Sequence, residues 1–460
     1  MAPEKVAAQI TSEVVRNTDG DPLSIERGVR QRLADKISDT MVGLWLLVAE
    51  HLRLGTWDLL CGWTQQPTMR IEPRLALQLV HEAALCLKGV RERRHVTLRG
   101  FEILNGLPFL ATDTAVHHLL DSHTVAQAQQ LQIALGKIRR VSGDFAGKLL
   151  LIDPHRPCSY SRRHMRRHRK DSASKPKKTA QMFFCLDGDT EQPLCCMIGT
   201  SARTVSQATP ELLGLAAQIL HPLPQNPLVA ADTEHFSAEL IDYVHLHTPF
   251  DIITPISAKR SAQKRLQTIP DEKFTPHWAG YATAVLPYQP LNSQSGPYYE
   301  LVQRQGERPD QWHFNSFLST TDRNPLDALT RDYPKRWHLE EFFNFNQALG
   351  WRHAGTLNLN IRYGQMSMAM LAQATIHRLR TRLGEPYQHS DAQHLASTVF
   401  RGLEGDIRVV RDTIVVTYYN APNKALLRNH YEGLPEKLRA ENVDPRIPWL
   451  YGFQLDFRFK

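Results

Sequence analysis

The sequence predicts an α/β protein in which a mixed sheet flanked by helices follows an all-α region and is interrupted by a β-rich insertion. Three observations predict this fold class. Residues 1–145 carry helical patterns throughout. From Gly147 onward, short apolar runs of the kind found in buried strands alternate with helical stretches. Residues 257–312 break that rhythm, because they are rich in Pro, Gln and Tyr and contain short strand-like pieces.

A chain of 460 residues is long enough for two or three domains. The predicted boundaries are 1–145 for a helical domain, 146–256 for the first part of a sheet domain, 257–312 for the insertion, 313–385 for the second part of the sheet domain and 386–460 for a small C-terminal region.

Within the helical region, Leu75, Leu79, Ala83 and Leu87 form an apolar stripe at helical spacing. Further on, Thr112-Asp113 caps a predicted short helix, residues 121–124 form a turn, and a longer helix covers 125–138. Helix, short turn and helix is the shape of a helix-turn-helix DNA reader, and equally of any helical hairpin.

The predicted sheet contains three consecutive strands and then alternates helix and strand. The strands are 148–153, 181–186, 194–199, 227–232, 251–256 and 313–318, with helices at 209–220 and 237–245. The insertion has strand-like pieces at 281–286 and 298–303. After it we predict an Asn324-Pro325 cap, a helix kinked or starting at Pro334, a helix over 358–383, a hairpin of 407–410 with 414–418, and a final strand at 453–459.

The composition predicts a cytoplasmic protein. The longest apolar run, 41–49, is far short of the ~20 residues that span a bilayer, and the N-terminus lacks an apolar signal region. Six cysteines without a Cys-x-x-Cys pair indicate reduced thiols, with Cys185, Cys195 and Cys196 on core strands.

The basic charge is concentrated in one segment. Between His155 and Lys178 there are ten Arg or Lys and one acid, so this stretch contributes +9 to a net charge of +8 and the rest is nearly neutral. Such a patch suits a polyanion; the alternative is a solvated basic loop without a partner.

Carboxylates end two of the predicted strands, at Asp153 and Asp232, and a later helix carries Glu340. Strand ends that meet at one edge of a sheet bring distant carboxylates together. Three carboxylates can hold two divalent cations, and their hard oxygens favour Mg²⁺ or Mn²⁺. On a regular α-helix, Tyr333, Arg336, Glu340 and Gln347 would share one face; the alternative is a solvated helix with Trp337, Phe342 and Phe343 in the core.

In this order of elements the chain resembles the RNase H-like DDE transposases of bacterial insertion sequences. More narrowly, Tyr333-x2-Arg336-x3-Glu340 matches the first three positions of the Tyr-x2-Arg-x3-Glu-x6-Lys signature of one large group. The surrounding Arg336-Trp337-x-Leu339-Glu340-x-Phe342-Phe343 is also typical of that group, and the resemblance covers about 147–383. The chain departs from the signature at its last position, where Gln347 replaces Lys.

The resemblance implies a DNA transposase that cleaves transposon ends and transfers the 3′-hydroxyl into target DNA. Asp153, Asp232 and Glu340 would bind two Mg²⁺ or Mn²⁺ ions, and Tyr333 and Arg336 would contact DNA phosphate near the cut. The basic loop leaves the strand of Asp153, so Arg162, Arg163, Arg166 and Arg167 are expected near bound double-stranded DNA, with 1–145 as a DNA-binding domain. A homodimer holding two inverted repeats, in a bacterial cytoplasm at the nucleoid, is also implied.

Two other interpretations stay open: an inactive or domesticated DNA-binding relative, and a related metal-dependent nuclease that cuts without strand transfer. Lesser candidates have competing explanations. Glu341 is a weaker second acid. Cys158, His164 and His168 mimic part of a zinc spacing, Asp187 and Asp189 are better explained by a turn, and Trp278 and Trp312 are either structural or stack on a displaced base.

Overall fold

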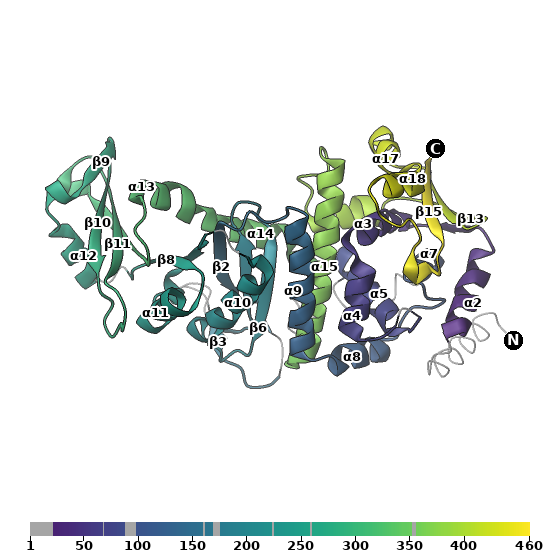
Figure 1. Ribbon diagram of the computed structural model, residues 1–460, viewed down its shortest axis with the longest axis horizontal. Helices are drawn as coiled ribbons and strands as arrows, with labels where there is room; N and C mark the ends of the chain where they lie inside the picture. The colour runs from purple at the N-terminus through teal and green to yellow at the C-terminus, as the bar shows by residue number, and fades with distance from the viewer. Residues whose placement is uncertain are drawn as a thin grey trace. The chain divides into compact units, whose positions relative to one another are not determined.

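A computed structural model describes residues 22–67, 69–87, 98–159, 162–168, 175–222, 225–257, 260–351 and 356–460 (Figure 1). The chain forms two compact units. One is Gln132–Asn344; the other combines Met1–Leu131 with Phe345–Lys460. Among the described residues, no helix is both long and apolar enough to cross a membrane.

The Gln132–Asn344 unit is built on a nine-stranded mixed sheet of order β6-β5-β2-β7-β8-β12-β11-β10-β9. Its strands are β2 (Leu149–His155), β5 (Gln181–Asp187), β6 (Pro193–Gly199), β7 (Leu228–Ala231), β8 (Asp251–Pro255), β9 (Thr275–Trp278), β10 (Tyr281–Tyr288), β11 (Tyr298–Gln305) and β12 (His313–Ser319). β2, β7 and β8 are parallel. β5 runs antiparallel to both of its neighbours, β2 and β6, so β6 has the same direction as β2. This order and direction are those of an RNase H-like sheet, as the sequence predicts.

The helices α10 (Val205–Leu220) and α11 (Ala238–His247) pack on this sheet, α10 against β5 and β6 and α11 against β8. α10 begins four residues before the predicted start at 209. Thr204 and Gln207 form a reciprocal capping box there, and this cap sets the start although Pro210 lies within the second turn. The predicted core position of three cysteines is confirmed, since Cys185 on β5 and Cys195 and Cys196 on β6 are buried.

The β-rich insertion extends the main sheet. β11 pairs with β12, which pairs with β8, so β9, β10 and β11 continue the same sheet outward (Figure 1). The helix α12 (Arg260–Gln267) contributes Leu266 to a cluster with Phe274, Val302 and Phe314. Trp312 packs against that cluster, and the Arg304 guanidinium lies over its ring, 3.8 Å from the ring centroid. These contacts favour a structural role for Trp312 over stacking on a DNA base.

Residues 325–346 change helix type three times. α13 (Pro325–Asp327) passes into a π-helix (Ala328–Asp332), then a 3-10 helix, η7 (Tyr333–Trp337), then α14 (His338–Asn346). The Asn324 cap is confirmed, since its Oδ1 accepts hydrogen bonds from the backbone N–H groups of Leu326 and Asp327. A regular α-helix from Tyr333 to Gln347 was the wrong prediction. Pro334 lacks the N–H that a continuous α-helix needs, and the helix type changes beside it.

The second unit combines both ends of the chain. Its main helices are α2 (Pro22–Leu33), α3 (Leu46–Leu54), α4 (Thr56–Thr64), α5 (Glu72–Ala84), α7 (Arg99–Leu104), α8 (Asp113–Ser122), α15 (Leu359–Leu383), α16 (Ala392–Leu395), α17 (Lys424–Tyr431) and α18 (Leu434–Ala440). Its sheet has the order β1-β13-β14-β15, from β1 (Ile37–Asp39), β13 (Gly405–Val410), β14 (Thr413–Tyr418) and β15 (Gln454–Phe459). The predicted hairpin and final strand are confirmed.

This unit differs from the predicted domains in three ways. Residues 386–460 fold with the N-terminal helices instead of forming a separate region. α15, which was predicted to belong to the sheet domain, packs on α3, α5 and α8. The N-terminal part is also not purely helical, because β1 pairs with β13. The residues of β1 and β13 that pair are more than 360 positions apart. A boundary drawn from changes in local composition does not detect contacts between such distant parts of the chain.

Candidate active site

Asp153 and Asp232 lie side by side on the sheet. The parallel register of β2 and β7 runs from Leu149 opposite Leu228 to Ile152 opposite Ala231, and the two aspartates are the next residues on the two strands. β2 continues for two residues beyond Asp153, whereas Asp232 ends β7 and caps the following 3-10 turn, Thr233–His235. The structure therefore brings the two predicted aspartates together.

Their proximity perturbs the ionisation of Asp153. Burial, together with the negative charge of Asp232, raises the pKa of the Asp153 carboxyl to about 7, and the Arg336 and Arg156 guanidinium groups only partly offset this. Two carboxyl groups placed this way favour a proton or a cation between them, since two bare negative charges in a buried site repel each other.

Asp232 remains the more acidic of the two. Burial alone would raise its pKa, but the hydrogen bond and the charge of His235 bring the pKa below its ordinary value. The Nδ1 atom of His235 lies 2.6 Å from Oδ1 of Asp232. The two aspartates thus have opposite pKa shifts, which is a frequent property of catalytic carboxylate pairs.

Arg336 and Tyr333 reach the same site from η7. Arg336 Nη1 lies 3.4 Å from Asp153 Oδ1, and the Arg336 side chain is hydrogen-bonded to the Tyr333 hydroxyl. A 3-10 helix has about three residues per turn, so side chains three positions apart fall on one face. The Tyr333 ring packs edge-on against Phe317 of β12, with ring centroids 4.7 Å apart.

Glu340 does not join the aspartates in this arrangement. It is exposed in the first turn of α14, and the described residues contain no group of three or more His, Cys, Asp and Glu side chains placed to hold a metal ion. Gln347 begins the next 3-10 turn, Gln347–Leu349, in the other unit. The predicted common face of all four signature residues was therefore wrong, because it assumed one regular α-helix.

The alternative of a solvated helix placed Trp337, Phe342 and Phe343 in the core, and the structure buries two of these three residues. Phe342 and Phe343 are buried, and Phe343 stacks on His155 of β2 at 4.4 Å between ring centroids. Trp337 is 58% exposed instead of buried, because the 3-10 turn rotates it away from the face that packs on the sheet.

Three side chains beside the aspartates were missed by the sequence analysis: Arg156, Glu234 and His235. Arg156 donates hydrogen bonds to both carboxylate oxygens of Glu234, and its positive charge also acts on Asp153. The signal that would have found Glu234 and His235 is the short turn Asp-Thr-Glu-His after a buried strand, since an aspartate cap brings the next three residues back toward itself.

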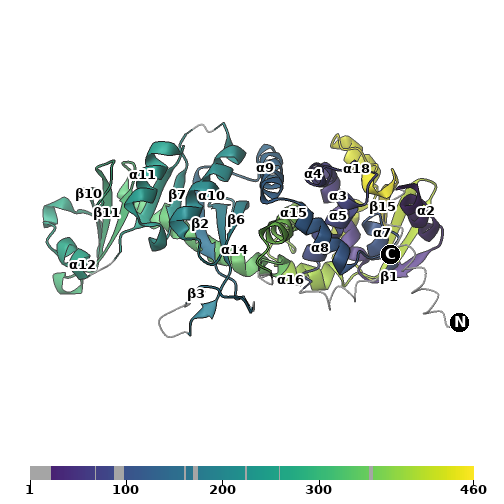
Figure 2. The ribbon, with the colours of Figure 1, turned by 90° about the horizontal axis from the view of Figure 1, so that it is seen from below.

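The basic loop contains a β-hairpin, which we call the basic arm (residues 155–180). β3 (Arg167–His168) pairs with β4 (Lys177–Lys178), and Cys158 bridges Thr179 at its base (Figure 2). Residues 160–161 and 169–174 lie outside the described part of the chain. The four arginines that the sequence analysis predicted to contact DNA are all exposed: Arg162, Arg163, Arg166 and Arg167.

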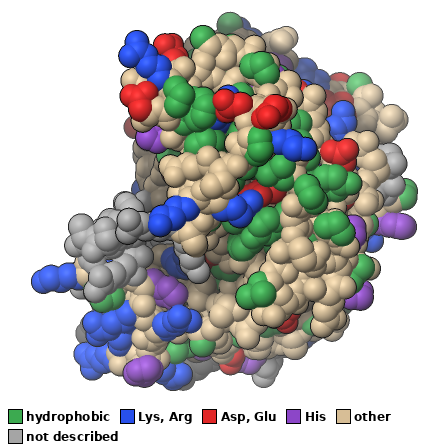
Figure 3. Space-filling view, turned by 90° about the vertical axis from the view of Figure 1, so that its left-hand side faces the viewer, with side chains coloured by type: hydrophobic (Ala, Val, Ile, Leu, Met, Phe, Trp, Pro, Cys, Tyr) green, Lys and Arg blue, Asp and Glu red, His purple; other side chains and the backbone are tan. Residues whose placement is uncertain are grey.

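Basic side chains of the arm surround a hollow of about 540 Å³, lined by Arg162, His164, Met165, Arg166, Arg167 and Lys178. Lys178 Nζ donates to the Arg163 carbonyl at 2.7 Å, and the Arg166 N–H donates to Ser201 Oγ at 3.2 Å. Figure 3 shows Lys and Arg side chains gathered at the lower left of the molecule, around the arm. The described cysteine and histidine residues of the arm form no metal-binding group.

The Asp187–Asp189 segment is a turn, as predicted. Asp187 accepts hydrogen bonds from the backbone N–H groups of Gly147, Asp189 and Thr190. The same turn contacts the helix that carries the signature. Asp189 pairs with Lys335 at 2.5 Å and Glu191 with His338 at 3.5 Å, so these acids serve to hold η7 and α14.

The predicted helix-turn-helix segment is present as α8 and α9 (Val125–Val141). The second half of α9 packs in the sheet unit. Gln132 Oε1 accepts a hydrogen bond from the Cys196 N–H, and Arg139 donates to the Pro193 carbonyl and to Asp144. Only the first two turns of α9 are outside this packing, which limits the surface available for reading a DNA groove.

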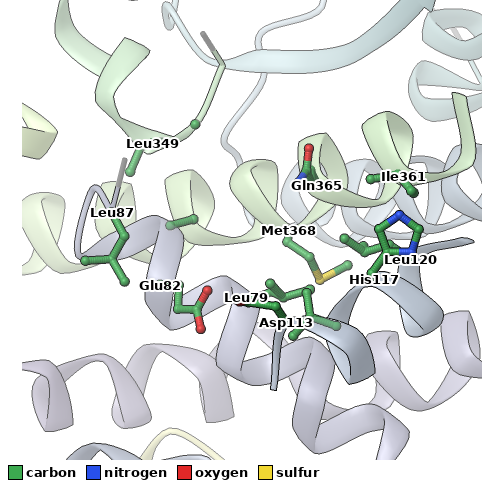
Figure 4. A pocket seen from close by; sticks show the side chains of 13 residues that line it. Leu79, Glu82, Leu87, Asp113, His117, Leu120, Leu349, Ile361, Gln365 and Met368 are labelled. Carbon is green, nitrogen blue, oxygen red and sulfur yellow. The ribbon is translucent and has the colours of Figure 1, made fainter. Parts of the chain in front are cut away.

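A separate apolar pocket of about 290 Å³ lies between α5, α8 and α15 (Figure 4). Figure 4 shows Leu79, Leu120 and Met368 at its centre, with Glu82 and His117 at its side. Its lining does not contain any of the predicted catalytic residues.

No family model matches this sequence, and no curated protein matches it. Among solved structures, the chain is similar to piggyBac transposase in a synaptic complex with hairpin DNA, with a TM-score of 0.42 and 12% identity over 80% of this chain and 82% of that chain. At this degree of similarity, neither a common activity nor a common set of residues follows from the comparison.

Proposed function

We propose that this chain is a DNA transposase of the insertion-sequence type, which cuts phosphodiester bonds at element ends and joins the released 3′-hydroxyl to target DNA. The observation that carries the proposal is the pair of half-buried aspartates on adjacent parallel strands of an RNase H-like sheet, with Arg336 and Tyr333 beside them. The Tyr-x2-Arg-x3-Glu signature supports the same function.

The two aspartates fit a divalent cation. They are oxygen donors, and they lie on adjacent strands. The raised pKa of Asp153 reflects burial first and then repulsion by Asp232, and a bound cation would relieve that repulsion. Asp153 and Asp232 would hold Mg²⁺ or Mn²⁺. Glu340 does not join them in this structure, and it would complete the site as the third carboxylate when DNA is bound. When bound, such ions activate the attacking oxygen and stabilise charge on the leaving oxygen.

The protein's own side chains would bind and orient the DNA. Arg336 presents a guanidinium at the edge of the aspartate pair, where it can bind the phosphate next to the cut, and Tyr333 holds Arg336 through its hydrogen bond. The basic arm leaves the strand of Asp153, so its arginines would contact the DNA backbone beside the site. Two copies of the chain would hold the two ends of one element.

The test combines cleavage and joining in one assay. The full-length chain is incubated with Mg²⁺, a labelled duplex made from the DNA that flanks its gene, and a supercoiled target plasmid. We expect nicks with 3′-hydroxyl ends and labelled strands joined to the plasmid, and neither product with the Asp153→Asn variant, which should still bind the duplex.

The outcome also separates the alternatives. Cleavage without joined products would identify a metal-dependent nuclease. Binding of the duplex without cleavage, equal in wild type and Asp153→Asn, would identify an inactive DNA-binding relative and overturn the proposal.

A further inference from the structure

His235 ends the 3-10 turn after β7 and lies against Asp232. Its side chain is 2% exposed, and its Nδ1 lies 2.6 Å from Asp232 Oδ1. An ionised carboxylate only accepts hydrogen bonds, so Nδ1 of His235 carries the hydrogen and donates it. A buried histidine used in this way fixes the orientation of the carboxylate that it contacts.

The hydrogen bonds to the Asp232 carboxylate end on a single oxygen. The backbone N–H of Glu234 also donates to Oδ1, at 3.1 Å, as expected for a cap of the turn. Within the described residues, no donor is hydrogen-bonded to Oδ2. Thr254 of β8 holds the main chain at the same point, since its Oγ1 donates to the Asp232 carbonyl at 2.8 Å.

We propose that His235 is a positioning residue that holds Oδ1 of Asp232 and leaves Oδ2 as the ligand oxygen for a divalent cation. The inference rests on the proposed function, because it requires that Asp232 binds a metal ion. Hydrogen-bond partners of metal-binding carboxylates fix their orientation, and their loss weakens metal affinity by about 10–100-fold. In the part of the chain that the structure describes, His235 makes no hydrogen bond to the arginines proposed to bind DNA.

The test compares His235→Asn with His235→Gln. The amide nitrogen of Asn lies close to the position of Nδ1, so it can still donate to Oδ1, whereas the amide of Gln lies nearer to the position of Nε2 and points away. Binding of Mn²⁺ to the DNA-free full-length chain is measured from the paramagnetic resonance signal of unbound Mn²⁺. We expect His235→Gln to weaken Mn²⁺ binding by about 10–100-fold and His235→Asn to stay within about threefold of wild type.

A structural control is available in Thr254→Val, which removes the hydrogen bond to the main chain of Asp232 without touching its carboxylate. We expect this change to lower the thermal midpoint while Mn²⁺ affinity stays within about threefold of wild type. If Thr254→Val weakens Mn²⁺ binding as much as His235→Gln, affinity follows the stability of the turn and the inference is overturned.

The remaining outcomes separate the inference from the proposed function. If both His235 variants bind Mn²⁺ as wild type does while Asp153→Asn loses binding, His235 has no positioning role but the metal site stands. Equal loss in both variants would show that the position of the donor does not matter, which also overturns the inference. If wild type binds Mn²⁺ no better than Asp153→Asn, the proposed metal site itself is wrong.

Discussion

At the scale of single residues, the carboxyl group of Asp153 lies among charges of both signs. Burial and the charge of Asp232 raise its pKa to about 7, and Arg336, 3.4 Å away, and Arg156 oppose them. Glu234, on the turn after β7, adds a smaller negative contribution. The site therefore contains a third carboxylate near the pair, although this is not the glutamate of the signature.

The two glutamates can be tested against each other with Glu340→Gln and Glu234→Gln, which keep side-chain size and remove one charge. If Glu340 completes the metal site when DNA is bound, Glu340→Gln should reduce DNA cleavage by on the order of 10³-fold or more, and Glu234→Gln by less than about tenfold. The two variants are compared with wild type by their single-turnover cleavage rates at saturating DNA. The reverse order of effects would assign the third carboxylate to Glu234.

A second residue-scale feature is the pair of fully buried histidines His51 and His81, whose ring centroids are 5.0 Å apart. Burial lowers the pKa of His81 to about 4 and also lowers that of His51. His51 contacts Thr56, and His81 contacts Asn105. Both rings are therefore neutral in the folded protein near neutral pH.

These histidines predict loss of stability in acid. Between pH 6.5 and about 4 the unfolded chain binds protons that the folded His81 does not, so the free energy of unfolding falls as pH falls through this window. His81 alone should contribute a loss on the order of 3 kcal/mol by pH 4. Chemical denaturation at several pH values should show this loss, and His81→Asn should flatten it. Equal pH dependence in both proteins would contradict the assignment.

At the scale of elements, the basic arm is a charged hairpin rooted in the strand that carries Asp153. Its arginines Arg162, Arg163, Arg166 and Arg167 are exposed, and all of them except Arg163 line the hollow of the arm. Changing all four to Gln should weaken binding to duplex DNA of any sequence. It should also make the dependence of log K on log salt shallower by about 0.9 for each DNA phosphate that the variant no longer neutralises.

The control replaces four exposed cations outside the arm with Gln, so that the net charge of the protein changes by the same amount. A suitable set is Arg27, Arg411, Lys424 and Arg446. Titrations at several salt concentrations should show a much smaller change for this set. Equal effects of the two sets would mean that total charge, and not the arm, drives binding.

At the scale of the whole molecule, one compact unit is assembled from the two ends of the chain. Trp449 is fully buried, packs against Trp57 at 5.9 Å between ring centroids, and donates its indole N–H to the Leu104 carbonyl at 2.9 Å. The C-terminal residues thus complete the core of helices that lie more than 300 positions earlier.

Trp449→Ala should therefore destabilise the N-terminal helices, by about 3–5 kcal/mol. Hydrogen exchange followed by mass spectrometry should show faster exchange in α3, α4 and α7, with little change in β2 and β7. Trp278→Ala is the matched control, because Trp278 is 54% exposed and should cost within about 0.5 kcal/mol. Unchanged exchange in α3 and α4 would show that the C-terminal residues are dispensable for that core.

Much of the sheet was predictable from sequence alone. Buried strands appear as continuous apolar runs, and helix starts such as Thr112, Asn324 and Asn358 have side chains that cap the following backbone N–H groups. Asp153 lies near the end of β2, Asp232 directly follows β7, and the two strands run parallel. The meeting of the two aspartates therefore also followed from local pattern and from one rule about parallel strands.

The tertiary structure alone decided three things. It placed Arg156, Glu234 and His235 around the aspartates, it left Glu340 exposed, and it joined residues 386–460 to the N-terminal helices. Apolar periodicity and capping are properties of a few neighbouring residues, so sequence determines them directly. Contacts between distant parts of the chain form only in the folded protein. These contacts decide which side chains face an aspartate, which helix type forms around Pro334, and how β1 pairs with β13.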